Sequence, residues 1–204
     1  MFPWVVVLSA FLVALVFHEV SHGWVAYRLG DPTAKALGRL SLNPLRHIDL
    51  VGTVLVPWLL IATHAPIIFG WAKPVPINDQ QLGHPKRDLI WVGLAGPAAN
   101  LALALLTAAA MRLAHLPEGS AWWAVGATVV LINLVLACFN LLPIPPLDGS
   151  RVLVGLLPVS AARWVAKVEP FGFLILIALM YVGVINRVLW PLVVGAARLL
   201  GVAW

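Results

Sequence analysis

The residues best suited to chemistry are His18, Glu19 and His22, which form an H-E-x-x-H pattern within the first apolar stretch. Positions i and i+4 of a helix lie on one face, so both imidazoles can bind the same metal ion. Glu19 then lies beside a metal-bound water and is the candidate general base. Three ionisable side chains on one turn of a membrane helix also need a neutralising partner, and a divalent cation is such a partner. We therefore predict a hydrolytic metal site at this turn, with a polar cluster or proton relay between helices as the alternative.

A hydrolytic zinc site has three protein ligands and one open position, so a third ligand is needed. Of the 8 acidic residues, most lie in loops or at helix ends, where a solvated charge needs no ligand role. Asp148 differs, because apolar residues flank it and three prolines within residues 143–146 break the preceding helix. Broken backbone at membrane depth is tolerated where it lines a cavity. Asp148 is therefore the predicted third ligand.

Three asparagines could share this cavity. Asn140 is close to Asp148 in sequence and could orient substrate or stabilise an oxyanion, with an interhelical hydrogen bond as the equal alternative. Asn133 lies on the same helix face as Asn140, and for it the interhelical bond is the preferred interpretation. Asn100 follows small residues that let helices approach closely, and it is a candidate either for such a bond or for substrate binding.

The composition indicates a membrane protein. Hydrophobic residues make up 62% of the 204 residues and charged residues only 10%, with a mean hydropathy of +0.97. The net charge of +5 does not indicate a nucleic-acid partner, because the basic residues sit in short loops between apolar runs, where they orient a chain in the bilayer. The single Cys138 excludes a disulfide framework within the chain.

Apolar stretches able to enter a membrane set the expected fold. They cover residues 2–27, 51–69, 89–113, 122–142 and 171–200. The last is long enough for two short spans, broken at Asn186-Arg187 or at Trp190-Pro191. We predict an all-α polytopic membrane protein, a single domain of residues 1–204 with five to six transmembrane helices.

The loop charges favour a re-entrant segment at residues 51–69. If that segment turns back, most basic residues share one side and only Arg112 and Arg187 face the other; if it spans, they divide about evenly. The residues on the shared side are Arg28, Lys35, Arg39, Arg46, Lys73, Lys86, Arg87, Arg151, Arg163 and Lys167. We therefore expect the N-terminus outside and the metal site nearer the cytoplasmic side of the cell membrane.

Two segments between the helices look extended. Residues 36–43 show partial alternation, and residues 70–77 carry prolines at alternate positions. We predict short interfacial β-strands there, with irregular loops as the alternative. Such strands could take an unwound substrate as an added strand, which makes Trp71, Lys73 and Pro74 candidate substrate-binding residues.

These motifs resemble those of the site-2 protease family of intramembrane metalloproteases. The matching residues are His18-Glu19-x-x-His22, Gly96-Pro97-x-x-Asn100, Asn140-x-x-Pro143 and Leu147-Asp148-Gly149, and the loops at 30–40 and 70–76 resemble the small prokaryotic branch without PDZ or CBS domain. Many relatives have Gly where this chain has Ser150, and many have an additional helix before the first motif.

The resemblance implies a three-helix catalytic core and one zinc ion per chain, held by His18, His22 and Asp148, with Glu19 as general base. It also implies a transmembrane protein as substrate, cut within the lipid bilayer. A homodimer is left open. The alternative function is a metal-ion or proton transporter that uses the same His, Glu and Asp side chains as a pathway.

Overall fold

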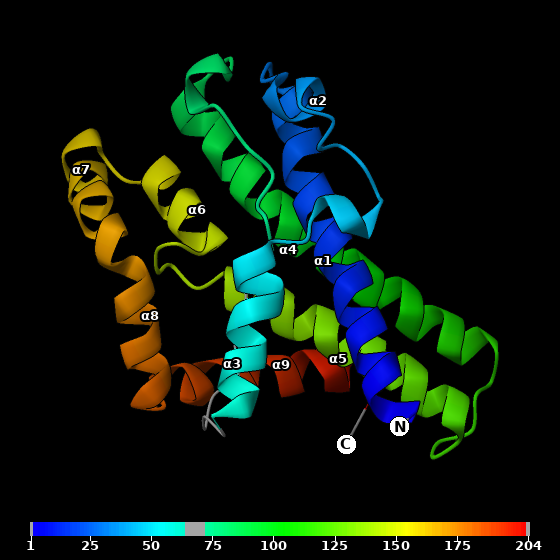
Figure 1. The fold of residues 1–204 in the computed structure, drawn as a ribbon. Helices are drawn as coiled ribbons and strands as arrows, with labels where there is room; N and C mark the ends of the chain where they lie inside the picture. Colours follow the sequence, from blue (N-terminus) through cyan, green and yellow to red (C-terminus); the bar gives the residue numbers. More distant parts are fainter. Residues whose placement is uncertain (1, 64–71, 203–204) are drawn as a thin grey trace.

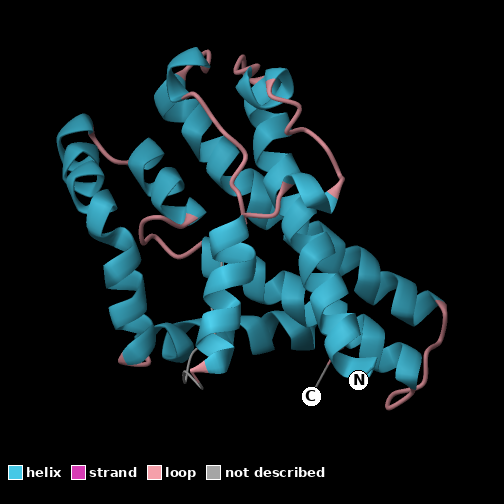
Figure 2. Ribbon diagram, in the orientation of Figure 1, coloured by secondary structure: helices cyan, strands magenta, loops and turns pink. Residues whose placement is uncertain are grey.

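The computed structural model describes residues 2–63 and 72–202, and these form a helical assembly (Figures 1 and 2). The longest helices are α1 (Phe2–Arg28), α4 (Pro85–Leu113) and α5 (Ala121–Asn140). The remaining elements are α2 (Thr33–Ala36), the 3-10 turn η1 (Pro44–Arg46), the π-helical η2 (Leu50–Leu55), α3 (Val56–Ala62), η3 (Asp79–Gln81), α6 (Asp148–Leu156), α7 (Val159–Val168), η4 (Glu169–Phe171), α8 (Gly172–Tyr181) and α9 (Val184–Leu199). The predicted all-α class is confirmed.

Four helical segments of the described chain are long and apolar enough to cross a membrane. They are Trp4–Arg28, Pro85–Leu113, Ala121–Asn140 and the continuous α7–η4–α8 unit Val159–Tyr181. A span needs about 20 apolar residues, so length and composition support a multi-pass membrane protein. The fifth and sixth spans stay a prediction.

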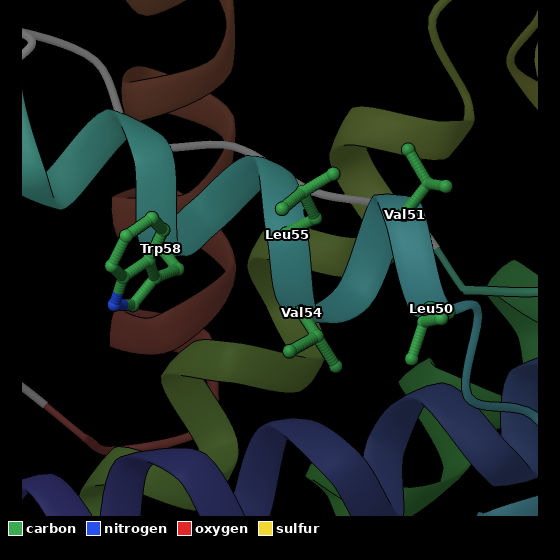
Figure 3. Close-up of a pocket in the computed structure, with 5 residues that line it drawn as sticks. All are labelled: Leu50, Val51, Val54, Leu55 and Trp58. Carbon is green, nitrogen blue, oxygen red and sulfur yellow. The ribbon is translucent and has the colours of Figure 1, made fainter.

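The segment Leu50–Ala62 is helical but is only 13 residues long, which is shorter than a span. Leu50, Val51, Val54, Leu55 and Trp58 line a shallow apolar pocket on it, and each side chain is about half exposed or more (Figure 3). Such a face suits contact with acyl chains. The re-entrant path stays a prediction, because residues 64–69 lie outside the described part.

The expected interfacial strands are not confirmed. Ala36 closes α2 instead of starting a strand, and residues 39–43 and 72–77 are neither helical nor strand, while residues 70 and 71 are not described. One backbone hydrogen bond, from the Lys73 N–H to the His47 carbonyl, joins the second segment to the turn that follows the first. The side chain of Arg39 supplies further links by donating to the carbonyls of Lys73 and Pro74. The Arg39 side chain thus satisfies carbonyls that neighbouring backbone N–H groups would satisfy in a β-sheet.

The C-terminal apolar stretch breaks at Gly183, not at Asn186-Arg187 or Trp190-Pro191 as expected. Gly183 has φ +76°, a left-handed conformation that favours glycine and ends α8. Both expected positions lie inside α9, which tolerates Pro191. α9 packs against α5, and Val193 and Ala197 are fully buried in the cluster that also contains Val130 and Leu134.

Three helices form the centre of the fold: α4 packs against α1 and α5, and α1 also contacts α5 (Figure 1). Small residues allow the approach. A Cβ atom added to Gly96 on α4 would lie 2.3 Å from Nε2 of His22 and 2.6 Å from Nε2 of His18. The predicted three-helix core therefore has the α1 histidines pressed directly against α4.

Candidate metal centre

His18 and His22 lie one turn apart on α1 and face α4. Their ring centroids are 4.7 Å apart in an edge-to-face arrangement, and both side chains are buried. The Nε2 atoms are 3.1 Å apart. The i, i+4 spacing thus aims both imidazoles at one point, as predicted.

Asp148 is the first residue of α6 and brings a carboxylate to the same point. Its Oδ2 lies 3.0 Å from Nε2 of His18 and 3.2 Å from Nε2 of His22. The following residue explains how the turn approaches so closely, since a Cβ on Gly149 would lie 2.3 Å from the Leu141 carbonyl oxygen. The proline-rich turn and Gly149 together place Asp148 beside residues about 130 positions earlier in the chain.

The second nitrogen of each histidine has a carbonyl partner. His18 Nδ1 lies 2.6 Å from Oδ1 of Asn100, and His22 Nδ1 lies 2.6 Å from the Val92 carbonyl oxygen. Because both partners can only accept, each ring must donate its proton at Nδ1. Both Nε2 atoms then carry lone pairs, so three acceptors meet with no donor among them.

This donor set fits zinc. Three acceptor atoms within 3.2 Å of one another repel unless a cation lies between them. A tetrahedral zinc ion with bonds of about 2.0–2.1 Å separates its ligands by roughly 3.3–3.4 Å, close to the distances here. Zinc sites typically combine imidazole and carboxylate ligands, and the second ring nitrogen of each histidine is typically hydrogen-bonded, as here. Within the described residues, His18, His22 and Asp148 form the one group of at least three candidate ligands.

Glu19 lies next to His18, and its side chain is partly buried. Its Oε2 accepts a hydrogen bond of 2.9 Å from the backbone N–H of Val75. This contact cannot be predicted from residue types, because it joins α1 to a loop 56 residues away. The candidate base is therefore held by main chain from outside the helix core.

The asparagines divide into two groups. Asn100 is fully buried and bonds His18, so in this structure it supports a predicted ligand, and its predicted contact with substrate stays a prediction. Its amide donates to Oδ1 of Asn133 at 2.9 Å, which confirms the interhelical bond expected of Asn133. Asn140 instead donates to the Leu136 carbonyl of its own helix, 3.0 Å away.

Of the other candidate substrate-binding residues, Lys73 and Pro74 do not join the cluster. Trp71 lies outside the described residues. Lys73 and Pro74 are exposed, and their carbonyls accept from Arg39 at 2.7 and 3.2 Å. Sequence reasoning missed the Val92 carbonyl and the Val75 N–H, because main-chain partners leave no signal in residue type.

Comparison with known proteins identifies relatives of this chain. The sequence model of peptidase family M50 matches residues 114–183, which contain Asp148. The protein YwhC of Bacillus subtilis is 38% identical over 188 residues, covering 89% of this chain and 82% of its own length. Rip2 of Mycolicibacterium smegmatis is 32% identical over 189 residues, covering 93% and 71%. Rip2 of Mycobacterium tuberculosis is 35% identical over 182 residues, covering 89% and 69%.

These three relatives are named as zinc metalloproteases. No solved structure matches the chain. The aligned lengths cover most of this chain and more than two thirds of each relative, so the likeness extends well beyond the segment of the family match. The chain therefore belongs to peptidase family M50, the site-2 protease family, and is a metalloprotease.

Proposed function

We propose that this chain is an intramembrane zinc protease that hydrolyses peptide bonds of transmembrane substrate proteins. The observation that carries the proposal is that Asp148 of α6 meets His18 and His22 of α1, a helix that can cross a membrane. The histidines lie six to ten residues before the end of α1 at Arg28, which corresponds to roughly 9–15 Å of helix. A site at this depth could hydrolyse peptide bonds within the bilayer, where the active site of a soluble protease does not enter.

The site would hold one zinc ion per chain through His18, His22 and Asp148. When bound, zinc would act as a Lewis acid and make a water molecule acidic enough to ionise near neutral pH. The Asn100 side chain and the Val92 carbonyl fix the two rings so that each keeps a lone pair at Nε2.

Glu19 is the proposed general base. Its Oε2 is occupied by the Val75 N–H, which leaves Oε1 to accept the proton of the attacking water and to return it to the leaving amine. Asn140 stays a candidate for substrate orientation or oxyanion stabilisation, because its bond to the Leu136 carbonyl uses only one of the two amide N–H groups.

The proposed substrate is a transmembrane segment that unwinds locally, because a helix hides its carbonyls in i to i−4 hydrogen bonds. The structure does not support addition of the substrate as a strand on residues 73–76, because no backbone N–H there is left to donate to it. Pro74 and Pro76 have no N–H, and those of Lys73 and Val75 already donate to His47 and Glu19. The proposal places the enzyme in the cell membrane, with the site nearer the cytoplasmic side, and leaves a homodimer open.

The test is cleavage of a single-span substrate in detergent by wild type, Glu19→Gln and Glu118→Gln. Glu118 is exposed in the loop between α4 and α5, so its change controls for the loss of a carboxylate. We expect cleavage by wild type and Glu118→Gln, no cleavage by Glu19→Gln, and one zinc per chain in all three. Cleavage by zinc-loaded Glu19→Gln at the wild-type rate would overturn the proposal.

A further inference from the structure

The contact between Glu19 and Val75 joins the proposed base to a loop. The Val75 backbone N–H donates to Glu19 Oε2 over 2.9 Å, and the Val75 side chain is only 4% exposed. A hydrogen bond to an ionised carboxylate is about twice as strong as one between neutral groups. The bond therefore restricts how the carboxylate can rotate.

The sequence around Val75 leaves few other backbone donors. Pro74 and Pro76 lack an N–H, so Val75 carries the single N–H of residues 74–76. The prolines also fix their own φ angles near −65°, which restricts the backbone on both sides of that donor. This short segment therefore presents one main-chain donor, and that donor is directed at Glu19.

Two further contacts hold the segment against α1. A Cβ added to Gly23 would lie 2.7 Å from Val75 Cγ1, so the glycine after His22 permits close packing of the loop. The guanidinium of Arg39 donates to the carbonyls of Lys73 and Pro74 at 2.7 and 3.2 Å, and to that of Arg46. Arg39 thus ties the loop that carries Val75 to η1.

We propose that the Val75 N–H is a positioning group for Glu19 and that Arg39 is a positioning residue that holds the loop carrying it. The proposal rests on the proposed role of Glu19 as general base. A carboxylate held at one oxygen keeps its other oxygen ready for proton transfer, so loss of the donor slows the chemical step without weakening substrate or metal binding.

The first test compares Val75→Pro, which removes the N–H, with Val75→Ala, which keeps it. Both lose the branched side chain that packs on Gly23, so their difference reports the lost donor together with the fixed φ of proline. We expect kcat of Val75→Pro to be roughly 10- to 100-fold below that of Val75→Ala, with similar KM and one zinc per chain in both. Equal kcat values would overturn the proposal. So would a lower zinc content and a higher KM in Val75→Pro that together account for the whole difference in activity.

The second test uses Arg39 and stays informative if Val75→Pro does not fold. Arg39→Met should lower kcat at unchanged KM and zinc content, whereas Arg39→Lys, which can still donate to a carbonyl, should recover part of the rate. Wild-type kcat in Arg39→Met would overturn the proposal. Glu19→Gln measured in parallel separates the two hypotheses: if it is inactive while the Arg39 and Val75 variants behave as wild type, only the positioning role fails.

Discussion

The side chain of Asn100 donates to two helices and accepts from His18. Its Oδ1 lies 2.6 Å from His18 Nδ1, while its amide nitrogen lies 3.1 Å from the Ala14 carbonyl on α1 and 2.9 Å from Oδ1 of Asn133 on α5. The two acceptors fix which end of the amide faces the ring. Asn100 therefore sets the tautomer of His18 from a fully buried position where the three core helices meet.

Replacement of Asn100 by Leu should weaken zinc binding by roughly 10- to 100-fold, because partners of metal-bound histidines typically contribute that much to affinity. The His18 ring loses the acceptor that keeps its lone pair at Nε2, and the Asn133 side chain loses a donor. Competition with a chromophoric chelator measures the zinc affinity directly.

Asn140→Leu is the matched control for Asn100→Leu. Asn140 is also an asparagine of the same core, but its amide bonds to its own helix at Leu136. We expect zinc affinity within about threefold of wild type. Equal weakening by both variants would contradict the assignment of Asn100 to His18.

The three predicted ligands could be found from the sequence because their chemistry has a local signature. His18 and His22 share a helix face through spacing alone, and Asp148 stands out as an acidic residue in apolar surroundings after three prolines. The all-α class followed from hydropathy. These are properties of neighbouring residues, which a single sequence displays.

Features that the sequence does not predict depend mainly on contacts between distant segments, and one, the break at Gly183, depends on local backbone conformation. Asn100 gave two possible roles, and only the helix packing shows that it faces His18. The expected strands are not confirmed in the described residues, where Ala36 ends α2 and Arg39 donates to carbonyls that a strand ladder would otherwise use. The break at Gly183 was overlooked because polar and proline residues nearby offered stronger local signals.

Gly96→Ala should abolish zinc binding and proteolysis. The added methyl carbon would lie 2.3 Å from His22 Nε2 and 2.6 Å from His18 Nε2, inside the space where the ligand atoms converge. Alanine is otherwise favoured in helices by up to about 1 kcal/mol, so helix propensity cannot explain a loss. Zinc content of the purified protein and cleavage of a test substrate measure the effect.

Gly195→Ala is the control, because it makes the same change in a helix with open space around it. No atom lies within 4 Å of a Cβ built at Gly195. This variant should bind zinc and cleave as wild type does, and its melting temperature should be equal or slightly higher. Normal zinc content in Gly96→Ala would show that the ligands do not meet where α4 approaches α1.

Asp31→Ala should destabilise the fold by roughly 1–3 kcal/mol, because it leaves two partly buried donors without their acceptor. Asp31 is fully buried after the end of α1. Its Oδ1 accepts from the Thr33 N–H at 2.9 Å and its Oδ2 from the Asn78 N–H at 2.7 Å, which ties α1 to the segment before η3. Asp79→Ala at an exposed position should change stability by no more than about 0.5 kcal/mol. Thermal unfolding in detergent compares the three proteins.

The same pair of hydrogen bonds predicts how this effect depends on pH. Burial raises the pKa of Asp31, but the hydrogen bonds from Thr33 and Asn78 lower it further, so the folded pKa lies below the usual value. The unfolded state then binds more protons, and the contribution of Asp31 is present above its unfolded pKa of about 4. It is lost as the pH falls below that value and through the folded pKa. The melting temperatures of wild type and Asp31→Ala should therefore differ most at pH 6 and converge toward pH 3. A difference that stays constant over this range would show that the carboxylate charge contributes nothing at this position.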